Sequence, residues 1–179
     1  MLKWFSKGST QAMSTKVTIR TGERAPALSL PDTAGRAHSL AEALTNGPVL
    51  LTFFKVGCPT CQYAFPFIER LHRQFATHGA AVWGISQDDD AASRRFAADY
   101  GVSFPILIDR KPYEVSNGYG VGYTPTLFLI AEDGTVKLTG DGFSKPDLIQ
   151  AQKWLAQSLS TKAGDLFLPD ERVPEFKPG

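Results

Sequence analysis

Two cysteines, Cys58 and Cys61, are the only thiols among the 179 residues, and two residues separate them in the segment GCPTC. A pair with this spacing can form a redox-active disulfide, supply half of a zinc site, or be buried in a hydrophobic core. Two cysteines in a chain of this length do not make a disulfide scaffold, since such proteins are short and rich in cysteine. The pair is therefore the first candidate for chemistry, and the residues around it indicate which kind.

The residues around the pair predict a buried strand that leads directly into a helix. Residues 49–56 (VLLTFFKV) form an almost continuous apolar run, which is typical of a strand buried on both faces. Cys58 would stand at the helix N-terminus, where free backbone N–H groups and the helix dipole stabilise a thiolate. Cys61 would lie one turn further along on the same side, within reach of a disulfide. This context favours a redox pair over two cysteines buried for packing alone.

Two histidines follow the cysteines, and together the four residues superficially match a zinc site. His72 and His78 are six positions apart on one predicted helix, which places them about 120° apart around its axis. Zinc ligands must converge on a single point. We therefore expect no metal site and interpret both histidines as helix-surface residues. The acidic run at residues 88–90 is interpreted as the capped start of the next helix rather than as a metal site.

A second candidate for chemistry is Pro125, which precedes an apolar strand in the segment YTPTLF. A proline at the start of a strand is common and needs no functional role. The alternative is a cis bond between Thr124 and Pro125 that presents the backbone of Thr124 to a substrate. The segment by itself leaves both interpretations open.

The order of the predicted elements indicates an α/β fold in which helices flank a central mixed sheet. Residues 22–40 predict an N-terminal hairpin with its turn at residues 32–35. Strands and helices alternate through the centre, and an antiparallel hairpin at residues 126–140 closes the sheet. Right-handed crossovers would cover both sheet faces with helices. Further strands are expected at residues 80–86 and 104–109, and a last helix at residues 148–159.

Composition and length favour one globular domain, with 42% hydrophobic and 21% charged residues. We place this domain at residues 16–161. Residues 1–15 are expected to form a disordered leader, and residues 162–179, rich in proline and charge, an irregular tail.

The charge and the N-terminal residues bear on partners and on location. A net charge of +1 gives no long-range attraction to nucleic acid or to a membrane, and we expect neither as a partner. Lys3, Ser6 and Lys7 interrupt the apolar run that a secretory signal requires, and no stretch approaches the ~20 apolar residues of a membrane span. We expect a cytoplasmic protein; a removed signal with a periplasmic location is the alternative.

Over residues 22–160 the chain resembles the thioredoxin-like superfamily, in particular the thiol–disulfide oxidoreductases related to the cytochrome-biogenesis thioredoxins and to AhpC/TSA (peroxiredoxin-like) proteins. The resemblance implies a thioredoxin-like fold in which Cys58 is the nucleophile, Cys61 resolves, and Pro125 is cis. Pro59, Thr124 and Pro125 would contact the substrate. The segments that carry the resemblance are APALSLPDTAGRAHSL, VLLTFFKVGCPTCQYAFPFIERL, VWGISQDDD, GVSFPILID and YGVGYTPTLFLIAEDGTV, together with Gly140.

The chain departs from the family pattern at the groups that usually support the two thiols. Gly57 replaces the Trp that usually precedes the first cysteine, and Thr52 replaces a buried acid in the preceding strand. Ala64 replaces the Glu that the cytochrome-biogenesis branch keeps three residues after the second cysteine. Both familiar proton acceptors for the resolving thiol are therefore replaced. Lys55 is a candidate for lowering a thiol pKa through its charge.

The resemblance implies a thiol–disulfide oxidoreductase that acts on protein disulfides and is restored by an external reductant such as a thioredoxin, with no bound cofactor. The alternative enzyme is a thiol peroxidase, in which Cys58 would form a sulfenic acid and Cys61 would condense with it. The Pro-x-x-x-Thr/Ser pattern of peroxiredoxins does not precede Cys58, which favours the oxidoreductase. A dithiol that holds a soft metal such as copper(I) is a third hypothesis. The oligomeric state is left open.

Overall fold

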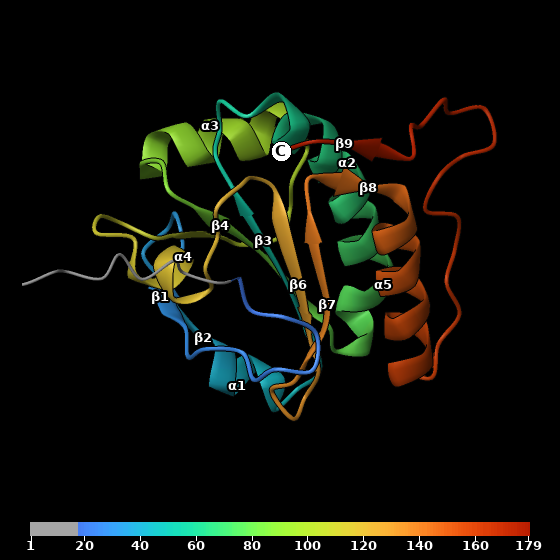
Figure 1. Ribbon diagram of the computed structural model, residues 1–179, viewed down its shortest axis with the longest axis horizontal. Helices are drawn as coiled ribbons and strands as arrows, with labels where there is room; N and C mark the ends of the chain where they lie inside the picture. The colour runs from blue at the N-terminus through green and yellow to red at the C-terminus, as the bar shows by residue number, and fades with distance from the viewer. Residues whose placement is uncertain (1–17) are drawn as a thin grey trace, which may run out of the picture.

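The computed structural model describes residues 18–179, so the leader predicted at residues 1–15 lies outside the described residues. Its centre is a five-stranded sheet with the strand order β5-β4-β3-β6-β7 (Figure 1). The central strand β3 (Val49–Phe54) pairs in parallel with β4 (Ala81–Ser86) and antiparallel with β6 (Thr126–Ile130). On the outer sides, β4 pairs in parallel with β5 (Ile106–Ile108), and β6 pairs antiparallel with β7 (Val136–Asp141). The predicted mixed sheet is confirmed.

Helices cover both faces of this sheet (Figure 1). One face carries α2, α3 and α5, and the other carries α1, α4 and the hairpin β1–β2. Every residue of β3 is buried for this reason, which explains its continuous apolar sequence. The bounds of the remaining elements are β1 (Ser29–Pro31), β2 (Ala37–Ser39), α1 (Leu40–Leu44), α2 (Pro59–Phe75) with a 3₁₀ turn (Ala76–His78), α3 (Asp90–Asp99), α4 (Glu114–Gly118), β8 (Phe143–Ser144), α5 (Lys145–Ser158) and β9 (Phe176–Lys177).

The alternation of side chains along β3 divides the interior into two cores. Leu50 and Phe54 belong to the core under α2, whereas Leu51 and Phe53 belong to the opposite core. In the first core, the ring of Phe54 lies 4.5 Å from that of Phe65 on α2, measured between centroids. Aromatic contacts of this kind fix the start of α2 against the end of β3.

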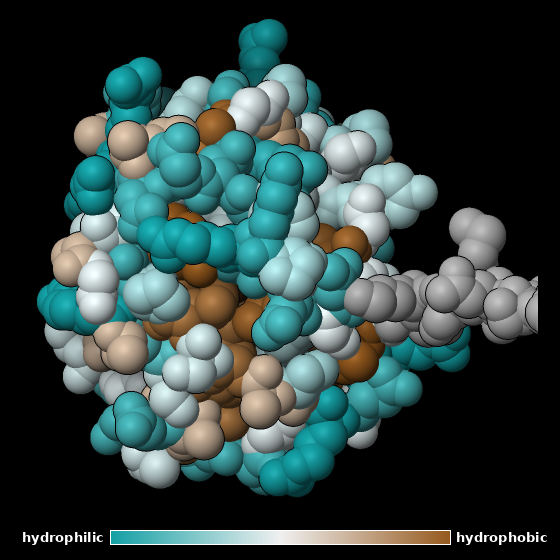
Figure 2. Space-filling model, turned by 90° about the vertical axis from the view of Figure 1, so that its left-hand side faces the viewer, coloured by the Kyte–Doolittle hydropathy of each residue, from teal (hydrophilic) through white to brown (hydrophobic). Residues whose placement is uncertain are grey.

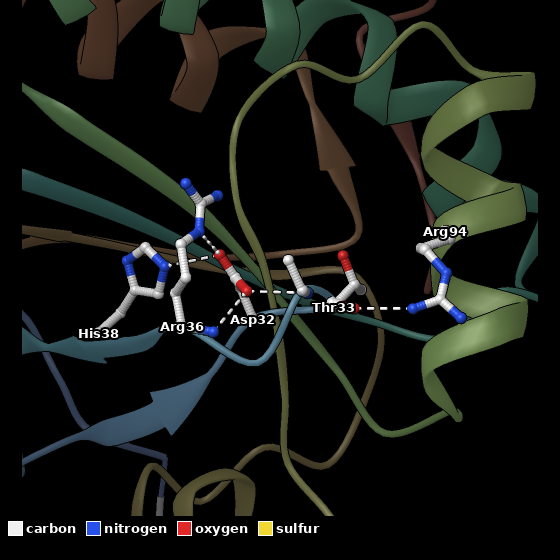
Figure 3. A network of polar contacts seen from close by, with 6 residues as sticks. Asp32, Thr33, Arg36, His38 and Arg94 are labelled. Atoms are coloured by element: carbon white, nitrogen blue, oxygen red, sulfur yellow. Dashed lines mark hydrogen bonds and ion pairs between the residues drawn. The ribbon is translucent and has the colours of Figure 1, made fainter.

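The predicted N-terminal hairpin is confirmed as β1–β2, and it lies against the edge strand β5. Its turn is organised by the buried carboxylate of Asp32, which accepts hydrogen bonds from the backbone of Ala34 and from Arg36 and His38 (Figure 3). The next residue, Thr33, donates its N–H to Ile106 of β5, at 3.1 Å. Arg94 of α3 donates to the carbonyl of Thr33 at 2.7 Å (Figure 3). The hairpin thereby covers the open edge of the sheet.

The Asp32 carboxylate should make stability depend on acid pH. Burial by itself would raise the pKa of Asp32, but the hydrogen bonds from His38, Arg36 and Ala34 outweigh it and hold the pKa well below its ordinary value. A lowered pKa gives stability that is present above the unfolded value of about 3.9 and lost as pH falls through the folded value. Asp32→Asn should therefore lower the free energy of unfolding by about 1–3 kcal/mol near neutral pH and by less below about pH 3.

Urea unfolding at both pH values measures this difference. Asp170→Asn, at an exposed aspartate, is the matched control and should change the free energy of unfolding by less than about 0.5 kcal/mol at either pH. A loss of stability in Asp32→Asn that is equally large in acid and at neutral pH would contradict the role of the ionised carboxylate.

The C-terminal residues 162–179 are irregular except for the short strand β9, and they pack against the domain. Leu166 is buried, and Arg70 of α2 bonds the carboxylate of Glu171. The segment then returns along α5 to the N-terminal end of α2, where β9 pairs with β8 (Figure 1).

Among residues 18–179, no helix is both long and apolar enough to span a membrane. Figure 2 views the side that carries α3, α4 and β1, where an apolar area lies among mostly polar residues.

Candidate active site

Cys58 occupies the N-cap of α2, as the sequence predicts. Its backbone is extended, and its Sγ accepts a hydrogen bond from the backbone N–H of Cys61 at 3.1 Å. Both cysteines are free thiols; Cys58 is half-buried and Cys61 is fully buried. The arrangement leaves one sulfur accessible at a helix terminus and holds the second directly behind it.

The loop between β3 and α2 is fixed by side chains from other elements. The N–H of Val56 donates to the carboxylate of Asp88 at 2.8 Å, and the amide of Gln62 donates to the carbonyl of Val56 at 2.9 Å. Of the predicted capping run, Asp89 does cap α3 by accepting from Ala92, whereas Asp88 supports the loop before Cys58. Nothing in the local sequence distinguishes these two neighbouring aspartates. Asp88 has its role because the end of β4 lies beside the end of β3 in the sheet, which brings its carboxylate to Val56.

The Thr124–Pro125 bond is cis, and it brings the backbone of Thr124 to the first thiol. The Cys58 thiol donates to the carbonyl oxygen of Thr124 at 3.2 Å. The hydroxyl of Thr126 bonds the carbonyl of Tyr123 and the carboxylate of Asp141, which holds the loop in place. The cis bond considered from the sequence is therefore confirmed. A second cis bond, Lys111–Pro112, was not foreseen.

The buried thiol of Cys61 has an unfavourable environment for a charge. Burial raises the pKa of Cys61 strongly, and the hydrogen bond with Cys58 raises it further. The two positions where the family pattern places a carboxylate hold Thr52 and Ala64, both buried. Among the described residues, the hydroxyl of Thr52 finds no hydrogen-bond partner. Cys61 is therefore a protonated thiol at neutral pH.

The remaining candidate residues lie around this pair in different ways. Pro59 is exposed at the first turn of α2, and Lys55 is exposed in the loop before Cys58. Of the two histidines, His78 is exposed, as predicted. His72, predicted on the helix surface, is half-buried there: its Nδ1 is buried and has no hydrogen-bond partner among residues 18–179, and burial lowers its pKa. Within residues 18–179, no three His, Cys, Asp or Glu side chains lie together as possible metal ligands.

Comparisons with known proteins find relatives that cover most of this chain. The model of the AhpC/TSA family matches residues 21–139. A thiol-disulfide oxidoreductase named ResA, from Geobacillus thermodenitrificans (strain NG80-2), is 34% identical over 75% of this chain and 78% of its own length. Both the thiol pair and the loop that faces it fall within the matched residues.

Two solved structures share the fold. A Chlorobium tepidum protein assigned as thiol:disulfide interchange protein DsbE superposes with a TM-score of 0.70 at 26% identity, covering 79% of this chain and 99% of that one. Peroxidoxin BcpB from Mycobacterium tuberculosis superposes with a TM-score of 0.64 at 25% identity, over 79% and 97% of the two chains. The thioredoxin-like architecture expected from the sequence is confirmed.

Proposed function

This chain belongs to the AhpC/TSA family and is a thiol–disulfide oxidoreductase, and we propose that Cys58 and Cys61 carry out its reaction. The observation that carries the proposal is the position of the Cys58 sulfur. It lies at the N-cap of α2, within hydrogen-bond distance of the Cys61 N–H and of the Thr124 carbonyl. One accessible sulfur backed by a second thiol is the arrangement that disulfide exchange requires.

The reaction follows in two steps from this geometry. The Cys58 thiolate attacks one sulfur of a substrate disulfide, so that a mixed disulfide forms and the other substrate sulfur leaves as a thiolate that takes up a proton. Cys61 then loses its proton and attacks the Cys58 sulfur. The Cys58–Cys61 disulfide forms, the second substrate sulfur is released, and two electrons have passed from the dithiol to the substrate.

The groups around Cys58 are suited to a polypeptide substrate. Half-buried Thr124 and exposed Pro59 border the sulfur, whereas Pro125 is buried. We propose that Thr124 holds the substrate as an extended strand and that Pro125 sets the direction of its backbone. Lys55 is proposed to act on the thiolate only through solvent, because exposed charges are strongly screened.

The second step should depend steeply on pH, because Cys61 is buried and its pKa is raised. At pH values below the pKa, the fraction of thiolate rises about tenfold for each unit by which the pH increases. Resolution of the mixed disulfide should therefore speed up about a hundredfold between about pH 7 and pH 9. Acid quenching of a single turnover, followed by mass analysis of the mixed disulfide, measures this rate. A rate that is flat above neutral pH would mean that another group removes the Cys61 proton.

Return to the dithiol needs an external reductant. Protein substrates and reductant partners are general features of thiol–disulfide oxidoreductases, and we propose a thioredoxin as the reductant of this one. Consumption of NADPH by thioredoxin and thioredoxin reductase, started by adding the Cys58–Cys61 disulfide form of this protein as the disulfide substrate, tests this proposal. Turnover that depends on thioredoxin supports it, and turnover with glutathione alone would contradict it.

A second candidate function, a thiol peroxidase, is favoured by the structural likeness to peroxidoxin BcpB. Peroxide would oxidise the Cys58 thiolate to a sulfenic acid, and Cys61 would displace water to form the disulfide. Peroxide consumption measured beside insulin reduction separates the two enzymes. Fast peroxide turnover without disulfide reduction would favour the peroxidase. A metal-binding role is tested separately: stoichiometric copper(I) in protein purified under reducing conditions would favour it.

A further inference from the structure

Residues 175–179 cross the N-terminal end of α2 and end beside the active site (Figure 1). Strand β9 pairs antiparallel with β8, with Lys177 opposite Phe143 and Phe176 opposite Ser144. The N–H of Lys145 donates to the carbonyl of Glu175 at 2.9 Å. This segment is therefore an extended strand seated on the domain by backbone hydrogen bonds, although its side chains are mostly exposed.

The same segment contacts the groups that surround Cys58. The hydroxyl of Thr60, in the first turn of α2, donates to the carbonyl of Pro178 at 2.6 Å. Gly179 lies so close to the cis-proline loop that a methyl group on its Cα would be 2.6 Å from the carbonyl oxygen of Thr124. That carbonyl is the one to which the Cys58 thiol donates. The segment thus covers the backbone that the proposed function assigns to the substrate.

Gly142 shows that the loop after β7 is shaped to receive this segment. Its N–H donates to the carbonyl of Pro125 at 2.7 Å, and its φ of +73° favours glycine. A Cβ at this position would lie only 2.5 Å from the carbonyl oxygen of Lys177. A side chain here would displace the segment, so the glycine serves both the cis-proline loop and the strand that lies over it.

We propose that residues 175–179 occupy the surface on which a substrate polypeptide lies, so that an extended, disulfide-bearing partner must displace them to reach Cys58. The inference rests on the proposed function, since it concerns access to the same thiol. The segment also shows which partner chemistry the surface accepts: an extended backbone that pairs with β8 and offers a carbonyl to Thr60. A basic side chain in the place of Lys177, whose Nζ lies 5.1 Å from the centre of the Tyr63 ring, would make a favourable cation–π contact.

Displacement does not require the domain to unfold. The preceding part of the tail is anchored independently by the buried Leu166 and by the bond between Arg70 and Glu171. Beyond Val173 the segment is held by a few backbone hydrogen bonds, by Thr60, by the contact of Lys177 with Tyr63 and by a partly exposed ion pair between Lys145 and Glu175. A short strand of this kind opens locally at a small cost, and its tether keeps it ready to return.

The test compares the full chain with a variant that ends at Val173, both carrying Cys61→Ser so that the mixed disulfide accumulates. Each protein reacts with a small disulfide, 2-hydroxyethyl disulfide, and with an extended peptide that contains a cystine bridge. The shortened chain should react about 5- to 30-fold faster with the peptide, because one or two net hydrogen bonds no longer oppose its binding. Its rate with the small disulfide should change less than about twofold.

A peptide rate that is unchanged or lowered in the shortened chain, while both proteins react with the small disulfide, would overturn this inference and leave the proposed function standing. Failure of both proteins to react with either disulfide would overturn the proposed function and the inference with it. Lys177→Ala in the full chain should raise the peptide rate about twofold through loss of the contact with Tyr63. The matched control Lys153→Ala, at an exposed residue of α5, should leave that rate unchanged. Equal effects of the two substitutions on the peptide rate would contradict the proposal that Lys177 helps to hold the segment on the substrate surface.

Discussion

Replacing Cys58 with serine should lower the rate of insulin reduction by at least about a thousandfold. Serine has nearly the size of cysteine, and its hydroxyl oxygen can accept the hydrogen bond from the Cys61 N–H in place of the sulfur, so α2 should remain capped. The activity should be lost because a hydroxyl neither ionises near neutral pH nor exchanges with a disulfide. Turbidity of reduced insulin measures the rate. Retention of more than about a tenth of the activity would show that Cys58 is not the nucleophile.

Cys61→Ser is the matched control for this prediction, since it changes the second thiol and leaves the first. It should also lose turnover, but it should still consume one disulfide per molecule and stop at the mixed disulfide. The two variants therefore separate attack from resolution. If both variants behaved alike in a single turnover, the assignment of roles within the pair would be wrong.

Replacing Phe65 with alanine should lower the free energy of unfolding by about 3–5 kcal/mol. Phe65 is fully buried, and its ring centroid lies 4.5 Å from that of Phe54, 4.9 Å from that of Phe96 and 5.8 Å from that of Phe104. Removing the ring opens a cavity where β3, α2 and α3 meet. Because a domain is stable by only about 5–15 kcal/mol, this loss is a large part of the total.

Phe176→Ala is the matched control for stability, because the same ring is 56% exposed on β9. It should change the free energy of unfolding by less than about 0.5 kcal/mol. Urea unfolding monitored by tryptophan fluorescence gives both values. A loss below about 1 kcal/mol for Phe65→Ala would mean that the aromatic cluster does not hold α2 against the sheet.

The sequence predicts the strand, the loop and the helix that carry the thiols because each has a strong local signal. The apolar run of β3 needs burial on both faces, and Cys58 precedes the first regular apolar repeat of α2. The α/β class follows from the alternation of such segments. The cis bond at Pro125 could be weighed but not decided locally, since the isomer depends on the loop's contacts with β7.

Other features depend on contacts between distant residues, which no local pattern encodes. Asp88 bonds Val56 across 32 positions of sequence, whereas its neighbour Asp89 makes the ordinary helix cap. His72 is expected on the helix surface once a zinc site is rejected, but its ring centroid lies 5.7 Å from that of Phe104. These contacts arise from tertiary packing, and the local sequence pattern alone does not show them.

The C-terminal residues illustrate the same limit most clearly. Proline and charge in residues 162–179 predict an irregular segment, and most of it is irregular. Composition gives no sign that Leu166 and Glu171 anchor it to α2, or that β9 pairs with β8. Only two residues of strand are formed, which is too short a run for an alternating pattern to be recognised.

The central claim is that the sulfur of Cys58 attacks a disulfide and forms a mixed disulfide before Cys61 acts. The most direct measurement is peptide mass mapping of the Cys61→Ser protein after it reacts with a cystine-containing peptide. The account predicts that one cysteine of the peptide is joined to Cys58 and that one free peptide thiol appears for each Cys58 modified. An unmodified Cys58, recovered with the peptide disulfide still intact, would contradict it.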